Sequence, residues 1–255
     1  MKIQTIPLHP ERGVTLTAYL QDVGGEYGFL ERPAMLVIPG GAYQFCSDRE
    51  AEPIALAYAN AGYQAFVLRY TVGDACAWPQ PLDDYEDAMQ LILDHARQWH
   101  VAADKIAIVG FSAGGHLAAC AATLAQHKPA AAVLVYPVIF PDSSILPAVV
   151  TPDKPRLPSA EQCVDSATCP CFFAHGRDDR TVDIRHTLAM EQALAMHGIP
   201  FESHIYSRGT HGFSTAVPLM MRGDVCARVK NWVADSIGWL AEQLGTLTYD
   251  GFVPV

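Results

Sequence analysis

Short hydrophobic runs alternate along the chain with longer segments of helical periodicity. Nearly continuous apolar runs are typical of strands that are buried on both faces of a sheet. Six runs are predicted as strands, and the last is more polar, as expected at a sheet edge: 34–38, 64–69, 106–109, 131–136, 171–174 and 201–206. Residues 15–21 alternate apolar with polar positions, which predicts an earlier antiparallel strand.

Helix-like segments separate these runs, and one more follows the last run. They span residues 50–61, 82–100, 114–126, 183–197 and 225–244. A chain that repeats strand and helix in this way builds a parallel sheet covered by helices on both faces. We therefore expect an α/β fold with a mostly parallel central sheet.

One stretch, residues 137–170, interrupts this alternation with five internal prolines and little periodicity. Long connections inside a compact domain are usually functional or mobile. We interpret the stretch as a lid or substrate-binding insertion, and the alternative is a passive surface excursion. A length of 255 residues suits one large α/β domain better than two, so we expect a single domain over 1–255.

Composition narrows the function classes further. Half of the residues are hydrophobic and the formal net charge is -10, which argues against a nucleic-acid or anionic-membrane partner. Residues 1–13 lack an apolar signal core, and no apolar run reaches 18 residues, so we expect a cytoplasmic protein. The seven cysteines are odd in number and lack Cys-x-x-Cys spacing, which indicates reduced thiols.

The pattern Gly-x-Ser-x-Gly lies within residues 109–115, between a predicted strand and a predicted helix. Small residues at Gly110 and Gly114 let such a turn close, and the helix that follows points its N-terminal N–H groups at the serine. We predict Ser112 as a nucleophile, with the Ala113 N–H available to an oxyanion. The alternative, a phosphate-binding loop, lacks the Gly-Lys-Ser/Thr of a P-loop.

A nucleophilic serine needs a base, and the base needs an orienting carboxylate. In this fold both should follow later strands, in the order serine, acid, histidine. His211 comes after the strand 201–206, beside a small Gly212, and is the predicted base. Asp178 and Asp179 both follow the strand 171–174, and the residues alone leave the choice between them open.

Three other histidines receive structural roles. His204 lies within its strand, and His175 is expected to bond within its own turn. His116, just inside the helix after Ser112, could line a pocket, although packing or backbone bonding is the favoured interpretation.

A glycine pair at Gly40 and Gly41 follows the strand 34–38. Such a loop leaves backbone N–H groups unobstructed, so that they can bind a developing oxyanion. At the end of a strand beside the nucleophile strand, this pair is a candidate oxyanion loop.

Together these motifs resemble those of the α/β-hydrolase superfamily, and within it the small bacterial esterases and lipases related to hormone-sensitive lipase and to acetyl-xylan and feruloyl esterases. The resemblance covers about residues 34–244 and rests on four motifs: 39–43 (Pro-Gly-Gly-Ala-Tyr), 110–116 (Gly-Phe-Ser-Ala-Gly-Gly-His), 175–182 (His-Gly-x-x-Asp-x-x-Val) and 211–213 (His-Gly-Phe). It implies Asp179 as the acid and the N–H groups of Gly41, Ala42 and Ala113 as the oxyanion hole. The related loop usually reads His-Gly-Gly-Gly, and Pro39 in place of the histidine favours the carbohydrate-esterase-like branch.

The resemblance implies a serine esterase that hydrolyses short-chain acyl esters, acetylated carbohydrates among them, through an acyl-enzyme. Such an esterase needs no metal and no organic cofactor, and its partner is a small-molecule ester. The resemblance leaves open whether the protein forms a homodimer. The alternatives are a peptidase of the same fold and a non-catalytic binding member. We further expect the rings of Tyr43, Phe111 and Phe213 to restrict the acyl pocket, unless they point into the core.

Overall fold

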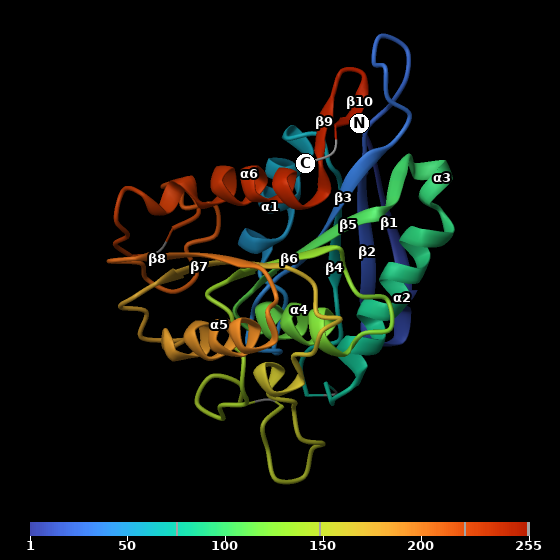
Figure 1. Cartoon of the computed structure of the whole chain (residues 1–255). Helices are drawn as coiled ribbons and strands as arrows, with labels where there is room; N and C mark the ends of the chain where they lie inside the picture. Colours follow the sequence, from blue (N-terminus) through green and yellow to red (C-terminus); the bar gives the residue numbers. More distant parts are fainter. Residues whose placement is uncertain (75, 148, 222, 254–255) are drawn as a thin grey trace.

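The computed structural model describes residues 1–74, 76–147, 149–221 and 223–253. An eight-stranded sheet forms its centre, in the order β1-β2-β4-β3-β5-β6-β7-β8 (Figure 1). The pairs from β4 to β8 are parallel, whereas β1 pairs with β2, and β2 with β4, antiparallel. The strands are β1 Lys2–His9, β2 Val14–Leu20, β3 Arg32–Ile38, β4 Gln64–Arg69, β5 Val101–Phe111, β6 Ala131–Val135, β7 Cys171–Gly176 and β8 Phe201–Tyr206.

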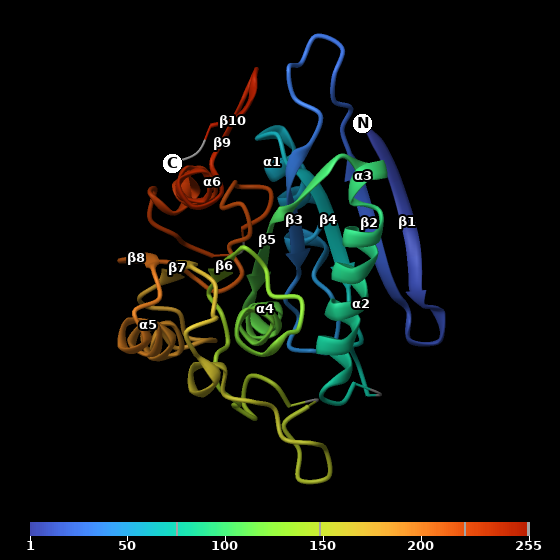
Figure 2. The same cartoon turned by 45° about the vertical axis from the view of Figure 1, so that its right-hand side comes forward.

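Helices cover both faces of the sheet (Figure 2). Buried side chains of α1 Glu52–Asn60 and α6 Trp232–Leu244 pack in one core cluster. Those of α2 Gln80–Asp94, α3 Ala96–Trp99, α4 Ser112–Leu124 and α5 Arg185–His197 pack in the other. This two-layered cover confirms the predicted α/β class, because strands buried on both faces must alternate with helices on either side.

The six predicted strands are confirmed, with β8 at the sheet edge and β2 as the predicted antiparallel strand. The sequence pattern missed β1, since this edge strand has no fully buried position to mark it. It also missed the hairpin of β9 Thr246–Thr248 and β10 Gly251–Val253.

All five predicted helices are present, but their boundaries differ from the predicted ones, and three of the differences have a clear structural reason. The segment predicted from residue 50 begins with a 3-10 turn, η2 Asp48–Glu50, and α1 starts only at Glu52 with a proline in its first turn. The predicted helix 82–100 divides at His95 into α2 and α3. The segment predicted from 225 is irregular up to the 3-10 turn η4 Val229–Asn231, before α6.

Residues 137–170 connect β6 to β7 outside the layered part of the fold (Figure 1). The stretch carries one 3-10 turn in its described part, η3 Ala160–Cys163. It is anchored by Leu146 and Leu157, which are buried in the same cluster as α4. Across the described ranges, no helix combines the length and the apolar character needed to span a membrane.

Candidate active site

Ser112 is the first residue of α4 and directly follows β5. Its φ of 52° lies in the left-handed region, which costs a non-glycine residue about 1–2 kcal/mol. The turn is close-packed: a Cβ on Gly110 would lie 2.4 Å from the Gly114 carbonyl oxygen, and one on Gly114 would lie 2.3 Å from the Ile38 oxygen. Glycine at both positions is therefore required for this backbone to present the serine at the carboxyl edge of the sheet.

His211 and Asp179 complete a chain of hydrogen bonds with Ser112. His211 Nε2 lies 2.9 Å from Ser112 Oγ, and His211 Nδ1 lies 2.7 Å from Asp179 Oδ2. The aspartate follows β7, and the histidine follows β8. Because these strands are parallel to β5, their loops meet Ser112 at the same sheet edge. The structure thus brings together the three residues that the sequence singled out.

Asp179 is 7% exposed and is held by several donors. Its Oδ1 accepts N–H hydrogen bonds from Thr181 at 2.8 Å and Val182 at 3.1 Å. Burial by itself raises the pKa of this carboxyl. Hydrogen bonds with His175 and His211 outweigh burial, however, and the pKa lies well below its ordinary value. Asp179 is therefore a permanent anion beside His211 at neutral pH.

Asp178 points elsewhere: its Oδ1 accepts the N–H of Gly209 at 2.8 Å, which joins the acid loop to the loop that carries His211. The other histidines take structural positions, as predicted. His175 bonds to the Val182 carbonyl within its own loop, and His204 contacts two surface carboxylates. His116 is fully buried between the Tyr43 hydroxyl and the Pro158 carbonyl.

The glycine loop after β3 approaches Ser112 from the other side. Gly41, Ala42 and Tyr43 all have positive φ, and the carbonyl of Gly41 accepts the N–H of Gln44. Within the described part of the chain, we find no protein acceptor for the N–H groups of Gly41, Ala42 and Ala113. Free backbone N–H groups beside a nucleophile can bind a developing oxyanion.

A pocket of about 220 Å³ opens in front of Ser112. It is lined by Gly41, Ala42, Phe45, Ser47, Arg49, Glu50, Ser112, Ile145, Thr181, His211 and Gly212. Phe45 is 58% exposed at this site, so its ring is free to contact a ligand. Ile145 belongs to residues 137–170, so this stretch supplies part of the pocket wall.

The prediction that three aromatic rings restrict this pocket is wrong. Tyr43, Phe111 and Phe213 are at most 1% exposed, and none of them lines the pocket. They pack in the two core clusters, as large aromatic side chains usually do. Phe45 and Ile145 occupy the wall instead. Sequence reasoning missed both because neither belongs to a chemical motif.

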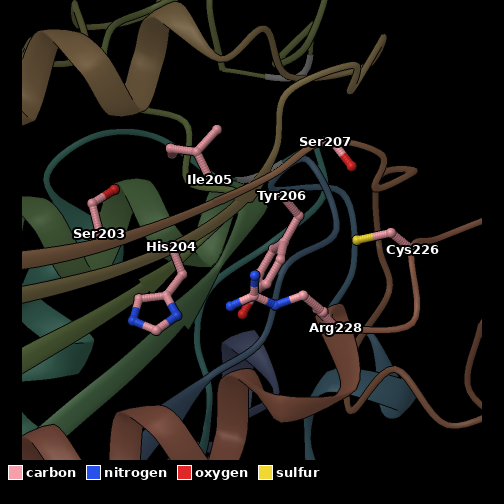
Figure 3. Close-up of a pocket in the computed structure, with 7 residues that line it drawn as sticks. All are labelled: Ser203, His204, Ile205, Tyr206, Ser207, Cys226 and Arg228. Carbon is pink, nitrogen blue, oxygen red and sulfur yellow. The ribbon is translucent and has the colours of Figure 1, made fainter.

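A second hollow, of about 450 Å³, lies along the edge strand and shares no residue with the site around Ser112. Figure 3 shows that its side chains alternate across β8: His204 and Tyr206 point to one side, and Ser203 and Ile205 to the other. The loop before α6 adds Cys226 and Arg228. This arrangement carries no nucleophile paired with a base.

A serine on a strand-to-helix turn, bonded to a histidine and an aspartate from later loops, defines the class of serine hydrolases on a parallel sheet. Comparisons with known families agree. Residues 82–221 match the family described as Phospholipase/Carboxylesterase, and residues 27–135 match the family described as BD-FAE. The chain belongs to the α/β-hydrolase family.

A solved relative supports the same assignment. The α/β-hydrolase enzyme MGS-M1, from a Medee basin deep-sea metagenome library, is 41% identical, with a TM-score of 0.86. The alignment covers 96% of this chain and 98% of that one.

Two curated relatives are longer proteins. Endo-1,4-beta-xylanase B of Butyrivibrio fibrisolvens is 33% identical over 73% of this chain and 33% of its own length. Acetylxylan esterase of Xylanibacter ruminicola is 26% identical over 78% of this chain and 45% of its own length. The chain therefore spans between a third and a half of the length of these two curated relatives.

Proposed function

We propose that this protein is a serine esterase that hydrolyses short-chain acyl esters, with acetylated carbohydrates as the substrate class. The observation that carries the proposal is the hydrogen-bond chain from Ser112 through His211 to Asp179, at 2.9 Å and 2.7 Å. Nucleophile, base and orienting acid within hydrogen-bond reach are the requirement for acyl transfer at a serine.

In the first half of the reaction, His211 Nε2 accepts the Ser112 hydroxyl proton as Oγ attacks the ester carbonyl carbon. The carbonyl oxygen becomes an anion, which the N–H groups of Gly41, Ala42 and Ala113 stabilise. Asp179 holds the proton on His211 Nδ1 and stabilises the imidazolium. His211 then gives its proton to the departing alcohol, and an acyl-Ser112 ester remains.

In the second half, water occupies the place of the alcohol. His211 removes a proton from this water as its oxygen attacks the acyl carbon, and the same N–H groups stabilise the second oxyanion. When the intermediate collapses, Ser112 Oγ regains the proton from His211 and the carboxylic acid leaves. Every proton thus passes through one imidazole.

Two observations favour a small acyl group on a sugar. The pocket of about 220 Å³ is smaller than most drug-sized ligand sites. A curated relative is named an acetylxylan esterase and another a xylanase. We further propose that residues 137–170 form part of the substrate site, since Ile145 already lines the pocket.

The test is the Ser112→Ala variant. We expect it to stay folded and to lose at least about 10³-fold in kcat on p-nitrophenyl acetate, because it removes the attacking oxygen. A fluorophosphonate probe should modify Ser112 in the wild type. Modification of another residue, with Ser112 left free, would contradict the assignment. A protein that binds acetyl esters but never turns them over would indicate a silent binding member.

A further inference from the structure

We propose that Glu50 is a positioning residue of this esterase, which holds the oxyanion loop and the surroundings of His211 in a fixed relation. The inference rests on the proposed function, since it assigns a role within that same site. Glu50 ends the turn η2 and belongs to none of the catalytic motifs.

The carboxylate of Glu50 is buried and fully engaged. Glu50 is 4% exposed, and its Oε2 accepts the N–H of Gly40 at 2.9 Å. A Cβ placed on Gly40 would lie 2.8 Å from this Oε2 and 2.9 Å from Ser112 Cβ. The first glycine of the oxyanion loop is therefore packed closely against both the carboxylate and the nucleophile.

The second carboxylate oxygen of Glu50 bonds to Tyr136, whose ring packs against the predicted base, His211. Tyr136 donates its hydroxyl proton to Glu50 Oε1 at 2.8 Å, and its oxygen accepts the N–H of Ser214 at 3.1 Å. The Tyr136 ring meets the His211 ring edge to face, with centroids 4.8 Å apart. Glu50 thus fixes the ring against which His211 packs.

The neighbouring residue extends the connection. Arg49 Nη1 donates to the carbonyls of Gly212 at 2.8 Å and Met220 at 2.6 Å, in the loop that follows His211. The Ser214 hydroxyl donates to the Arg49 carbonyl. Two consecutive residues of one short turn therefore hold both the oxyanion loop and the histidine loop.

A carboxylate is a costly choice for a purely structural contact, since burying a charge is unfavourable unless it is compensated. Burial raises the pKa of the Glu50 carboxyl above its ordinary value, and hydrogen bonds from Tyr136 and Gly40 together with the nearby His211 offset only part of this rise. As an anion, Glu50 attracts the His211 imidazolium that forms during acyl transfer. This attraction would add to the two hydrogen bonds by which Glu50 holds Gly40 and Tyr136.

The experiment compares three variants with the wild type. Glu50→Ala removes both contacts, and Glu50→Gln can still accept the Gly40 N–H. Tyr136→Phe removes the hydroxyl that bonds to Glu50 but keeps the ring that packs against His211. Glu52→Gln is the matched control, because Glu52 is exposed two residues further along. For each protein, kcat and KM on p-nitrophenyl acetate are determined separately, together with the Tm and the rate of fluorophosphonate labelling.

We expect Glu50→Ala to lower kcat by about 10²-fold with KM changed less than about twofold, as when an interaction made only in the transition state is lost. Glu50→Gln should recover at least about a tenth of the wild-type kcat, since it restores the oxyanion-loop contact. Tyr136→Phe should lie between these two variants in kcat. The control should match the wild type in both constants. If Glu50→Ala does not fold, the test rests on Glu50→Gln and Tyr136→Phe, because these two substitutions leave the side-chain volume nearly unchanged.

Two results would overturn the inference. If the wild type turns over the ester and the Glu50 variants keep its kcat, or change KM alone, the carboxylate does not position the site. If the wild type neither turns over the ester nor labels at Ser112, the proposed function fails and this role fails with it. The wild-type control therefore distinguishes the two failures.

Discussion

Two adjacent aspartates show how finely the acid position is set at the level of single residues. Asp179 lies 2.7 Å from His211 Nδ1, whereas Asp178 bonds to the backbone N–H of Gly209. Successive residues of a loop point in different directions, so only one of the pair reaches the base. The two carboxylates therefore differ in role although their chemistry is the same.

This difference predicts an asymmetry between two otherwise equal substitutions. Asp179→Asn should lower kcat by about 10³–10⁴-fold, because the amide no longer holds the required tautomer of His211. Asp178→Asn should cost less than about tenfold, since an amide oxygen still accepts the Gly209 N–H. Steady-state kinetics on p-nitrophenyl acetate measure both. Equal losses, or the reverse order, would show that Asp179 is not the orienting acid.

The site residues were predictable from sequence to the extent that chemistry restricts them to motifs. Ser112 and His211 were predicted from their places after strands, while the choice of Asp179 needed the family resemblance. Glu50 and Phe45 were not predictable in this way. Glu50 lay at the start of a predicted helix, where a glutamate is normally solvated, and only tertiary packing buries it.

At the level of elements, α4 combines the site with the core. Twelve of its residues, Ser112 to Thr123, are buried, and His116 among them accepts the Tyr43 hydroxyl and donates to the Pro158 carbonyl. This histidine connects the segment after the oxyanion loop with the 137–170 stretch. Burial lowers the pKa of His116 to about 4.

The pKa of His116 predicts a loss of stability in mild acid. An unfolded histidine has a pKa of about 6.5, so between this pH and about 4 the unfolded chain binds a proton that the folded chain excludes. The free energy of unfolding should therefore fall by about 2 kcal/mol from pH 7 to pH 5 through His116 alone.

Urea unfolding of the wild type and of His116→Gln at both pH values measures this contribution. The variant should lose less stability than the wild type on acidification, even if it is less stable at pH 7. His186, whose pKa is also lowered to about 4, is present in both proteins, and burial, the main cause of its shift, is the same in both. Identical losses in the two proteins would show that His116 titrates normally.

The element predictions were correct where burial leaves a clear pattern. Central strands such as β3 are apolar over most of their length, here from Pro33 to Ile38, because both faces are covered. Edge strands and helix ends lack this signal: β1 has an exposed face, and the start of α6 depends on a turn that only the folded chain defines.

For the whole molecule, substrate size depends on how loops from distant elements close around Ser112. Phe45 comes from the segment after the oxyanion loop and Ile145 from the 137–170 stretch, and both line the pocket of about 220 Å³. The sequence analysis interpreted residues 137–170 as a lid or substrate-binding insertion, but it singled out neither Phe45 nor Ile145. The proposed preference for short acyl groups therefore rests on this pocket.

We predict that kcat/KM is highest for acetyl to butyryl esters in a p-nitrophenyl series from acetate to decanoate. A long apolar tunnel would instead add about 0.8 kcal/mol, or about fourfold, for each methylene. Ile145→Ala shortens one wall and should shift the optimum toward longer chains, whereas Leu188→Ala, on the exposed surface of α5, should not. A steady rise beyond the six-carbon acyl chain would refute the small pocket.

The parallel order of the sheet has a kinetic consequence for the folding of this protein. The hydrogen bond between Ser112 and His211 joins residues 99 positions apart, across β6, β7 and β8. Contacts of such high sequence separation form late, because the entropy of closing long loops must be overcome first. A collapsed chain can therefore hold most of its helices and still lack a nucleophile with a base. We therefore expect turnover to recover during refolding only when the last parallel strands have paired, and not when the chain first becomes compact.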